Sequence, residues 1–278
     1  MIKKLASILS LSVLWCSQAS ALISEQQIFC GSSLSDDQYL ELLELTNPNS
    51  FESYHEAPQR TARIAEIFGE AGDRRGIFSS MYVVITEESH RSTMDGVYEQ
   101  QHIAEQLVYR FAYRYLDAYH KHLTGETPDP KWDAYFQVAS DCNNSELYVL
   151  GAGVNTHLTY DLPMTLLDIG ADLDFKKDFM EFGNVLINKT RESADLTLAQ
   201  QGFDPYPFFN GFIFGQAIDA VAGHQTTAHF VFQKVRGDAW NDFARAYREN
   251  ESSRSMRAIT GRWQSRHFLL RFMPPPAS

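Results

Sequence analysis

The feature that most constrains the fold is a hydrophobic repeat in the first half of the chain. Its apolar side chains recur about every fourth residue, and they are Ile103, Leu107, Phe111, Tyr115 and Ala118. A spacing of three to four residues places side chains on one face of an α-helix. We therefore predict one long amphipathic helix from Met94 to about Leu123, ended by the turn-forming sequence TGETPDP.

Several other segments have helical periodicity or helix-capping residues. We predict helices at residues 35–46, 57–72, 145–162 and 172–200, one or two helices within 218–250, and a short final element in the basic and aromatic tail at 262–278. The segment 145–162 is apolar all round, which favours a helix buried in the middle of the domain, and Pro163 would end or kink it.

The stretch IFSSMYVVITEES at residues 77–89 is rich in β-branched and aromatic residues and is compatible with a strand. No partner strand with turn signals lies nearby, so we interpret it as a helix. The chain has neither internal repeats nor a series of strand patterns. The predicted class is all-α, a single orthogonal or bundle-like helical domain with a buried central helix.

The first 21 residues have the pattern of an export signal. Two lysines precede an apolar run too short to span a bilayer comfortably, and residues 19–21 read Ala-Ser-Ala, like a signal peptidase site. Cys16 opens a lipoprotein alternative, although Trp15 stands where a lipobox has a small residue. We expect cleavage near Ala21 and an exported protein, periplasmic or secreted.

This cleavage site suggests three parts: a signal peptide at 1–21, an N-terminal arm at 22–50 and a helical domain at 51–278. No later stretch is long and apolar enough to predict a transmembrane helix. The remaining cysteines, Cys30 and Cys142, are predicted to form a disulfide in an oxidising compartment, the alternative being two unrelated thiols. A formal net charge of -11 argues against nucleic acid as a partner.

The candidate site lies in the sequence GAGVNTHLTYDLP at residues 151–163. On a helix, His157 and Asp161 are one turn apart on the same face, and Asn155 lies just before them. This spacing suits two ligands of a divalent metal such as zinc, or a histidine base with the carboxylate that orients it. The alternative is a buried hydrogen-bond network that only joins helices.

Other polar clusters are weaker candidates. Glu99, His102 and Glu105 share one helix face but resemble a solvated stripe. The pairs His224/His229 and His120/His122 have spacings that separate their side chains on a helix. The aromatic loop FDPYPFFNGFIF at 203–214 is compatible with an apolar pocket, with lipid contact or with packing across helix ends. No GxSxG motif, phosphate loop or cysteine nucleophile is present.

Four motifs in a fixed order resemble the uncharacterised bacterial family DUF5995. The first is N-x-H-x-x-x-D-L-P on Asn155, His157, Asp161, Leu162 and Pro163. The second lies on Phe111, Tyr115, Asp117 and Ala118, and a late R-x-x-A-W segment lies on Arg236, Ala239 and Trp240. A further match on Asp178, Phe179, Asn184 and Leu186 is imperfect because Gly183 stands in the motif.

The resemblance covers roughly residues 75–245 and implies a fold and a candidate site, since the family has no established reaction. The exported N-terminus, the cysteine pair and the sequence GHQTTAH depart from it. The core motif also resembles a His/Asp helix of the zinc-dependent phospholipase C and nuclease group, although that group's tryptophan N-terminus and further histidines are missing here.

These observations support three hypotheses. The first is an ester or phosphoester hydrolase in which His157 and Asp161 bind a metal or act as base and orienter, with Asn155 and Arg236 steering the substrate. Arg236 suits this role because guanidinium matches carboxylate and phosphate geometry. The second is a non-catalytic exported protein that binds an apolar or amphipathic ligand. The third is a secreted factor that acts on a partner protein. The sequence does not define the oligomeric state.

Overall fold

The computed structural model describes residues 27–206 and 226–272, with side chains from residue 232 onward in the second range. Outside this description lie the predicted signal peptide at 1–21, the aromatic segment 207–214, His224 and the side chain of His229. The described chain is all-α, as the periodicity predicted. Its strands form a single antiparallel hairpin in which β1 (Ile28–Phe29) pairs with β2 (Ser32–Ser33).

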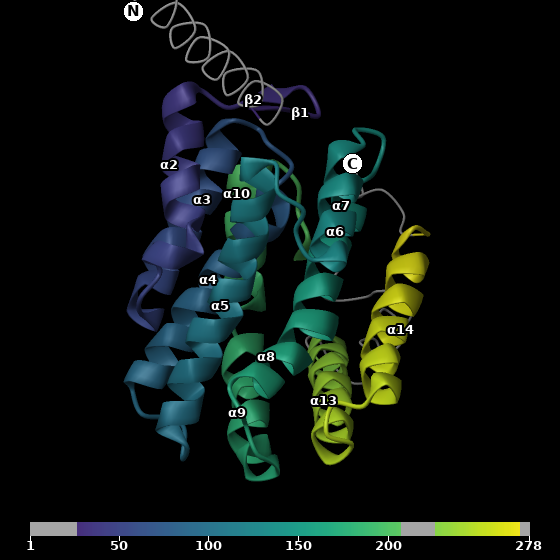
Figure 1. Cartoon of the computed structure of the whole chain (residues 1–278). Helices are drawn as coiled ribbons and strands as arrows, with labels where there is room; N and C mark the ends of the chain where they lie inside the picture. Colours follow the sequence, from purple (N-terminus) through teal and green to yellow (C-terminus); the bar gives the residue numbers. More distant parts are fainter. Residues whose placement is uncertain (1–26, 207–225, 273–278) are drawn as a thin grey trace, which may run out of the picture.

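The helices lie roughly along one direction, with α2 and α3 on one side of the molecule and α14 on the other (Figure 1). The α-helices are α2 (Asp36–Thr46), α3 (Ala57–Glu70), α4 (Gly76–Met94), α5 (Gln101–Thr124), α6 (Pro130–Ser140), α7 (Glu146–Asn155), α8 (Leu162–Asp168), α9 (Lys176–Ile187), α10 (Thr190–Gln201), α13 (Thr226–Arg248) and α14 (Ser253–Leu270). Short helical turns are η1 (Pro48–Ser50), η2 (Tyr54–Glu56), η3 (Thr156–Asp161) and η4 (Leu173–Phe175).

The long helix expected from Met94 begins later, at Gln101. The stretch 77–89 is helical as predicted, and α4 continues to Met94, where the chain turns through Gly96 in a left-handed conformation with φ 68°. The residues just before the new helix are held from a distance, because the carboxylate of Asp178 accepts the backbone N–H groups of Glu99 and Gln100 at 3.1 and 2.6 Å. Such a remote contact leaves no local sequence signal.

Three other segments also differ from the predictions. Residues 172–200 form two α-helices instead of one: α9 ends at Ile187, and α10 begins at Thr190. The tail is a long helix, α14, rather than a short element. Helix α6 was not predicted, although Asp129 as its cap and Pro130 in its first turn are ordinary helix-start signals.

The central helix is buried as predicted, and Pro163 does not end it. Ser145 caps α7, and the helix then widens into the π-helical turn η3 before α8 continues past Pro163 to Asp168. Proline lacks the N–H that an ordinary helical turn would use, and here it occupies the first turn of α8. The wide turn carries His157 and Asp161, and π-helical turns are frequent at functional sites.

The buried apolar side chains form two clusters. The larger joins α2 to α7 around residues such as Phe68, Tyr119 and Trp132, and it includes Phe29, Tyr39 and Leu42 from the expected N-terminal arm. The second joins the start of α5 to α8, α9 and α13 around Phe179 and Trp240. From Gln27 onward, no helix of the described chain is long and apolar enough to cross a membrane.

We predict that Gly153→Ala destabilises the fold by about 1–3 kcal/mol, because overpacking a tight core forces side chains to shift. A Cβ at Gly153 on α7 would lie 2.7 Å from the Cβ of Phe78 on α4. Urea unfolding of the two proteins measures the difference.

The matched control is Gly261→Ala in α14, where a Cβ would meet none of the described atoms within 4 Å. Alanine favours a helix over glycine by about 1 kcal/mol, so this variant should be at least as stable as the parent. Equal stability of the two variants would contradict the close approach of α4 and α7.

Candidate functional site

A cavity of about 350 Å³ lies where the two hydrophobic clusters meet. Helices α4, α5, α7, α8, α9, α10, α13 and α14 and the turn η3 contribute to its wall. Most of the lining is apolar, and it includes Phe78, Met81, Tyr82, Phe111, Leu162 and Phe182. This composition is typical of sites for small molecules, which have apolar walls and few polar groups.

Three of the four predicted site residues line this cavity. Asn155, His157 and Arg236 face it, and each is less than a tenth exposed. Asp161 is equally buried but lies behind His157, outside the lining. The structure therefore brings Asn155, His157 and Arg236 to one cavity and places Asp161 as a neighbour of His157.

Asp161 is held by a tryptophan that the sequence analysis did not identify. The indole N–H of Trp132 on α6 donates to Oδ2 of Asp161 at 2.8 Å, and Nδ1 of His157 lies 3.3 Å from the same oxygen. A carboxyl group inside a core needs such donors. The contact fixes the histidine with its Nδ1–H toward Asp161 and leaves Nε2 as an acceptor.

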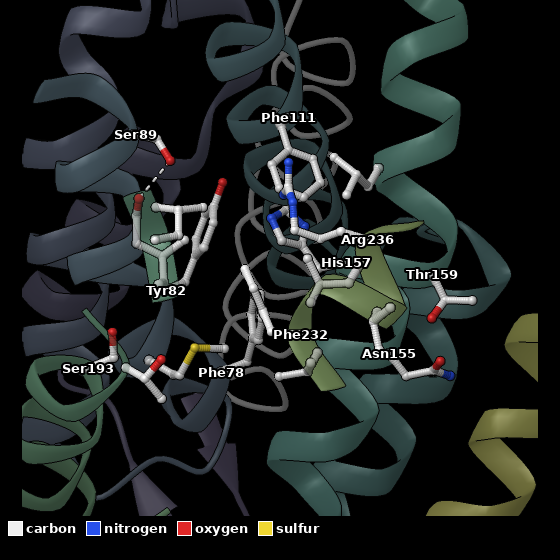
Figure 2. Close-up of a pocket in the computed structure, with 18 of the residues that line it drawn as sticks. Phe78, Tyr82, Ser89, Phe111, Asn155, His157, Thr159, Ser193, Phe232 and Arg236 are labelled. Atoms are coloured by element: carbon white, nitrogen blue, oxygen red, sulfur yellow. Dashed lines mark hydrogen bonds between the residues drawn. The ribbon is translucent and has the colours of Figure 1, made fainter. Parts of the chain in front are cut away.

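Aromatic rings surround the imidazole of His157. It stacks on Phe111 with ring centroids 3.6 Å apart, and the ring of Tyr82 meets it at 4.5 Å and 77° (Figure 2). Burial lowers the pKa of His157 below its ordinary value, and Asp161 offsets part of this shift. His157 is therefore neutral at pH 7, and its Nε2 has no hydrogen-bond partner in the described structure.

A second tryptophan ties the π-helical region to α14. The amide nitrogen of Asn155 donates to the carbonyl of Trp263 at 3.1 Å, and the indole N–H of Trp263 donates to Oγ1 of Thr156 at 3.1 Å. Arg266 donates to Oγ1 of Thr159 at 2.8 Å. The side-chain oxygen of Asn155 has no partner among the described atoms, so it is a second unpaired acceptor in the cavity wall.

Arg236 on α13 is a buried cation. Its Nη2 donates to the carbonyl of Phe179 at 2.5 Å, and its Cζ lies 4.3 Å from the centroid of the Phe179 ring. Burial lowers the pKa of Arg236 to about 10, which still leaves the guanidinium charged at neutral pH. It makes no ion pair with any described carboxylate. The Nε atom has no partner in the same set of residues.

Gly183 provides the space that Arg236 occupies. A Cβ at this position would lie 2.9 Å from Nε of Arg236 and 2.5 Å from Oε1 of Gln233. Both distances are too short for an ordinary contact. The glycine that interrupts the motif on α9 is therefore the residue that lets the guanidinium lie against this helix.

Within the described residues, the other polar clusters considered in the sequence lie outside the lining of this cavity. Glu99 pairs with exposed Lys177, and the side chains of His102 and Glu105 contact Gln106 and Gln101 on the surface. His122 stacks on Phe136, and burial lowers its pKa to about 3. His120 contacts Thr46.

The residues present do not form a recognisable metal site. No three His, Cys, Asp or Glu side chains gather into a ligand set within the described ranges. Structural and catalytic zinc sites use at least three protein ligands. Oδ2 of Asp161 accepts from Trp132 and lies 3.3 Å from the inner nitrogen of His157, and Asp161 is outside the cavity lining, so the pair does not present two ligand atoms to the cavity. The geometry fits a histidine oriented by a carboxylate better than two metal ligands.

Fold and site together define an all-helical protein with an apolar cavity between its two hydrophobic clusters and a small set of buried polar groups. The chain matches the model of a family of unknown function, DUF5995, over residues 55–270. It therefore belongs to this family. No curated protein and no solved structure matches the chain.

The buried histidine predicts a dependence of stability on pH. The unfolded chain takes up a proton at His157 below about pH 6.5, whereas the folded chain does so only at lower pH. The contribution of neutral His157 to the free energy of unfolding is therefore fully present above about pH 6.5. It falls on acidification, by up to about 1.4 kcal/mol per pH unit.

Urea unfolding between pH 7.5 and 5 measures this slope in the parent and in His157→Gln. His122 and His267, whose pKa values are also lowered, contribute equally to both proteins, so the difference in slope isolates His157. Identical slopes would mean that His157 titrates normally in the folded protein.

Proposed function

We propose that this protein binds an apolar or amphipathic small molecule in the cavity. The observation that supports this proposal is the cavity itself. Its volume is about 350 Å³, its lining is mostly apolar, and it lies between two packed clusters. Protein interiors are close-packed, and a space of this size falls within the range of small-molecule sites. The few unpaired polar atoms in its wall would orient the ligand.

The binding proposal predicts that partly filling the cavity weakens binding. Ser193 on α10 is buried, lines the cavity and has a hydroxyl without a partner among the described atoms, so Ser193→Phe would place a ring in the space. Figure 2 shows Ser193 well away from His157 and Phe111, so the substitution leaves that polar group intact.

Titration of an apolar fluorescent probe into the purified protein measures binding. We expect saturable binding by the parent and a loss of at least about tenfold in affinity for Ser193→Phe, as expected when a ligand must displace a packed ring. Leu198→Phe on the same helix is the matched control, because Leu198 is 43% exposed. No saturable binding by the folded parent would refute the proposal.

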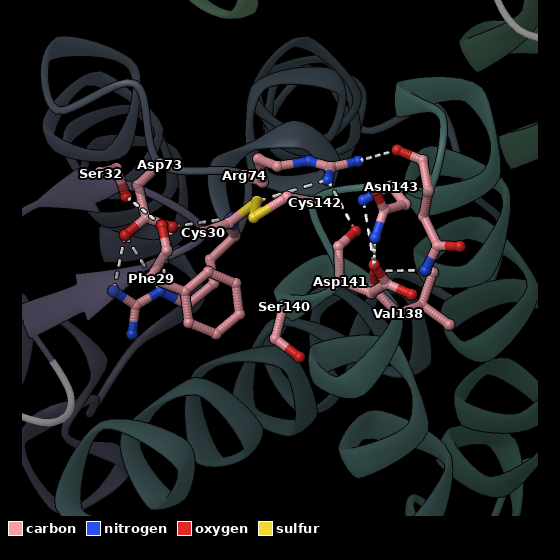
Figure 3. Close-up of a disulfide and its surroundings, with 12 residues drawn as sticks. Phe29, Cys30, Ser32, Asp73, Arg74, Val138, Ser140, Asp141, Cys142 and Asn143 are labelled. Atoms are coloured by element: carbon pink, nitrogen blue, oxygen red, sulfur yellow. Dashed lines mark hydrogen bonds and ion pairs between the residues drawn. A yellow bond between two sulfur atoms is a disulfide. The ribbon is translucent and has the colours of Figure 1, made fainter.

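We further propose that residues 1–21 direct export, to the periplasm or to the medium. The support is the disulfide between Cys30 and Cys142, which suits an oxidising compartment. Arg74 lies beside it and donates to the carbonyls of Asp141 and Asn144 at 2.9 and 2.5 Å (Figure 3). The disulfide links the N-terminal hairpin to the loop before α7. Fractionation of cells that express the protein tests where it is located.

A second function, ester hydrolysis, is favoured by the free Nε2 of His157. A neutral imidazole oriented by a carboxylate can take a proton from water as the water oxygen attacks an ester carbonyl. The imidazolium then returns that proton to the departing alkoxide. No hydrogen bond joins His157 to a serine, threonine or cysteine side chain in the described structure, so water is the nucleophile in this proposal.

Release of nitrophenol from nitrophenyl esters tests this second function. We expect His157→Gln to lower the rate by about 10²–10⁴-fold, the usual contribution of a general base, while probe binding is retained. Ser89→Ala, at another position of the cavity wall, controls for general disturbance of the cavity and should keep the parent rate. Equal rates for the parent and His157→Gln would exclude His157 as the base.

A further inference from the structure

The charge of Arg236 has no counter-ion in the described structure, and this missing partner indicates which chemical group a ligand would bring. Carboxylates on α4, α9 and α13 are bonded to other groups. Asp178 accepts the backbone N–H of Gln100, Glu88 pairs with Arg91, and Asp238 pairs with Arg266 and Lys234. Tyr98 is the remaining neighbour that favours the charged guanidinium, and its hydroxyl bonds to Ser92.

An unpaired cation inside an apolar core is costly, and the fold holds this one in place by several contacts. The carbonyl and ring of Phe179 fix one side of the guanidinium, and Gly183 makes room for Nε. A substantial part of the charge is therefore left without compensation at the cavity wall. An anionic group of a ligand would supply the missing partner.

The rest of the wall limits the ligand to one negative charge. Arg266, the other lining cation in the described residues, is paired with Asp238 and donates to Thr159. His157 is neutral, and its Nε2 and the Oδ1 of Asn155 are unpaired acceptors that would repel a second anionic group. One free guanidinium matches one carboxylate, whereas a phosphate monoester carries nearly two charges.

We propose that the cavity binds a single-chain amphipath with a carboxylate head, such as a fatty acid, with the carboxylate on Arg236. The acyl chain lies against the apolar wall formed by Phe78, Met81 and Tyr82. This inference rests on the proposed binding function and adds the chemical class of the ligand. It also accounts for a guanidinium that the described residues leave without a counter-ion.

Dodecanoate and dodecanol form the test pair, because they share a chain and differ in the head group. Isothermal titration at pH 7.5, below the micelle concentration, measures both affinities. We expect the parent to bind dodecanoate at least about tenfold more tightly than dodecanol, as for a hydrogen bond to a charged group. Equal affinities would overturn the carboxylate inference and leave the apolar cavity intact. Binding of neither would refute the proposed function itself.

Arg236→Gln removes the charge, and Arg236→Lys keeps it. We expect Arg236→Gln to lose dodecanoate affinity by at least about tenfold with dodecanol changed less than about threefold, and Arg236→Lys to recover part of the loss. Lys234→Gln, an exposed cation on the same helix, should leave both affinities unchanged. An equal loss of both ligands in folded Arg236→Gln would make Arg236 a structural residue and overturn the inference. If Arg236→Gln does not fold, the affinities of the parent for dodecanoate and dodecanol still test the carboxylate inference.

Discussion

The hydrogen bond from the indole of Trp132 to the carboxyl group of Asp161 is the contact on which the interior of this protein depends. It satisfies a group that would otherwise be costly in a core, and it does so from a different helix. Asp161 then holds the inner nitrogen of His157, so the imidazole keeps one orientation between aromatic rings. The outer nitrogen is left without a hydrogen-bond partner among the described atoms, in a residue that lines the cavity.

The cavity exists because two separately packed clusters meet without closing the space between them. Large rings line it from α4 and α5, and the π-helical turn displaces the central helix locally from an ordinary path. Polar contacts from Trp263 and Arg266 hold α14 against that turn. These hydrogen bonds therefore fix the side of the cavity formed by η3 and α14, where no apolar packing of the described residues crosses the empty space.

Much of the fold could be predicted from the sequence because local periodicity carries that information. The helices around Leu42, Ile64 and Leu107 follow from their apolar spacing, and the ambiguous stretch at Met81 became a helix for lack of a partner strand. The start of α5 could not be found this way, since the residues just before it are held by Asp178, far along the chain.

The candidate site could be predicted only in part. Asn155 and His157 share one short motif, so their proximity followed from helical spacing, and Arg236 was suggested by the family resemblance alone. Their common cavity depends on how η3 and α13 pack, which no local pattern encodes. Trp132, Trp263 and Gly183 were missed because an isolated tryptophan or glycine reads as an ordinary core or helix residue.

The space beside Gly183 links two positions that lie far apart in the sequence. The absent side chain at 183 and the long one at 236 occupy the same volume, since a Cβ at 183 would lie 2.9 Å from Nε of Arg236. In evolution, these positions should therefore vary together. A relative with a larger residue at 183 would have to shorten or redirect residue 236, and its cavity would then present a different chemistry to the ligand.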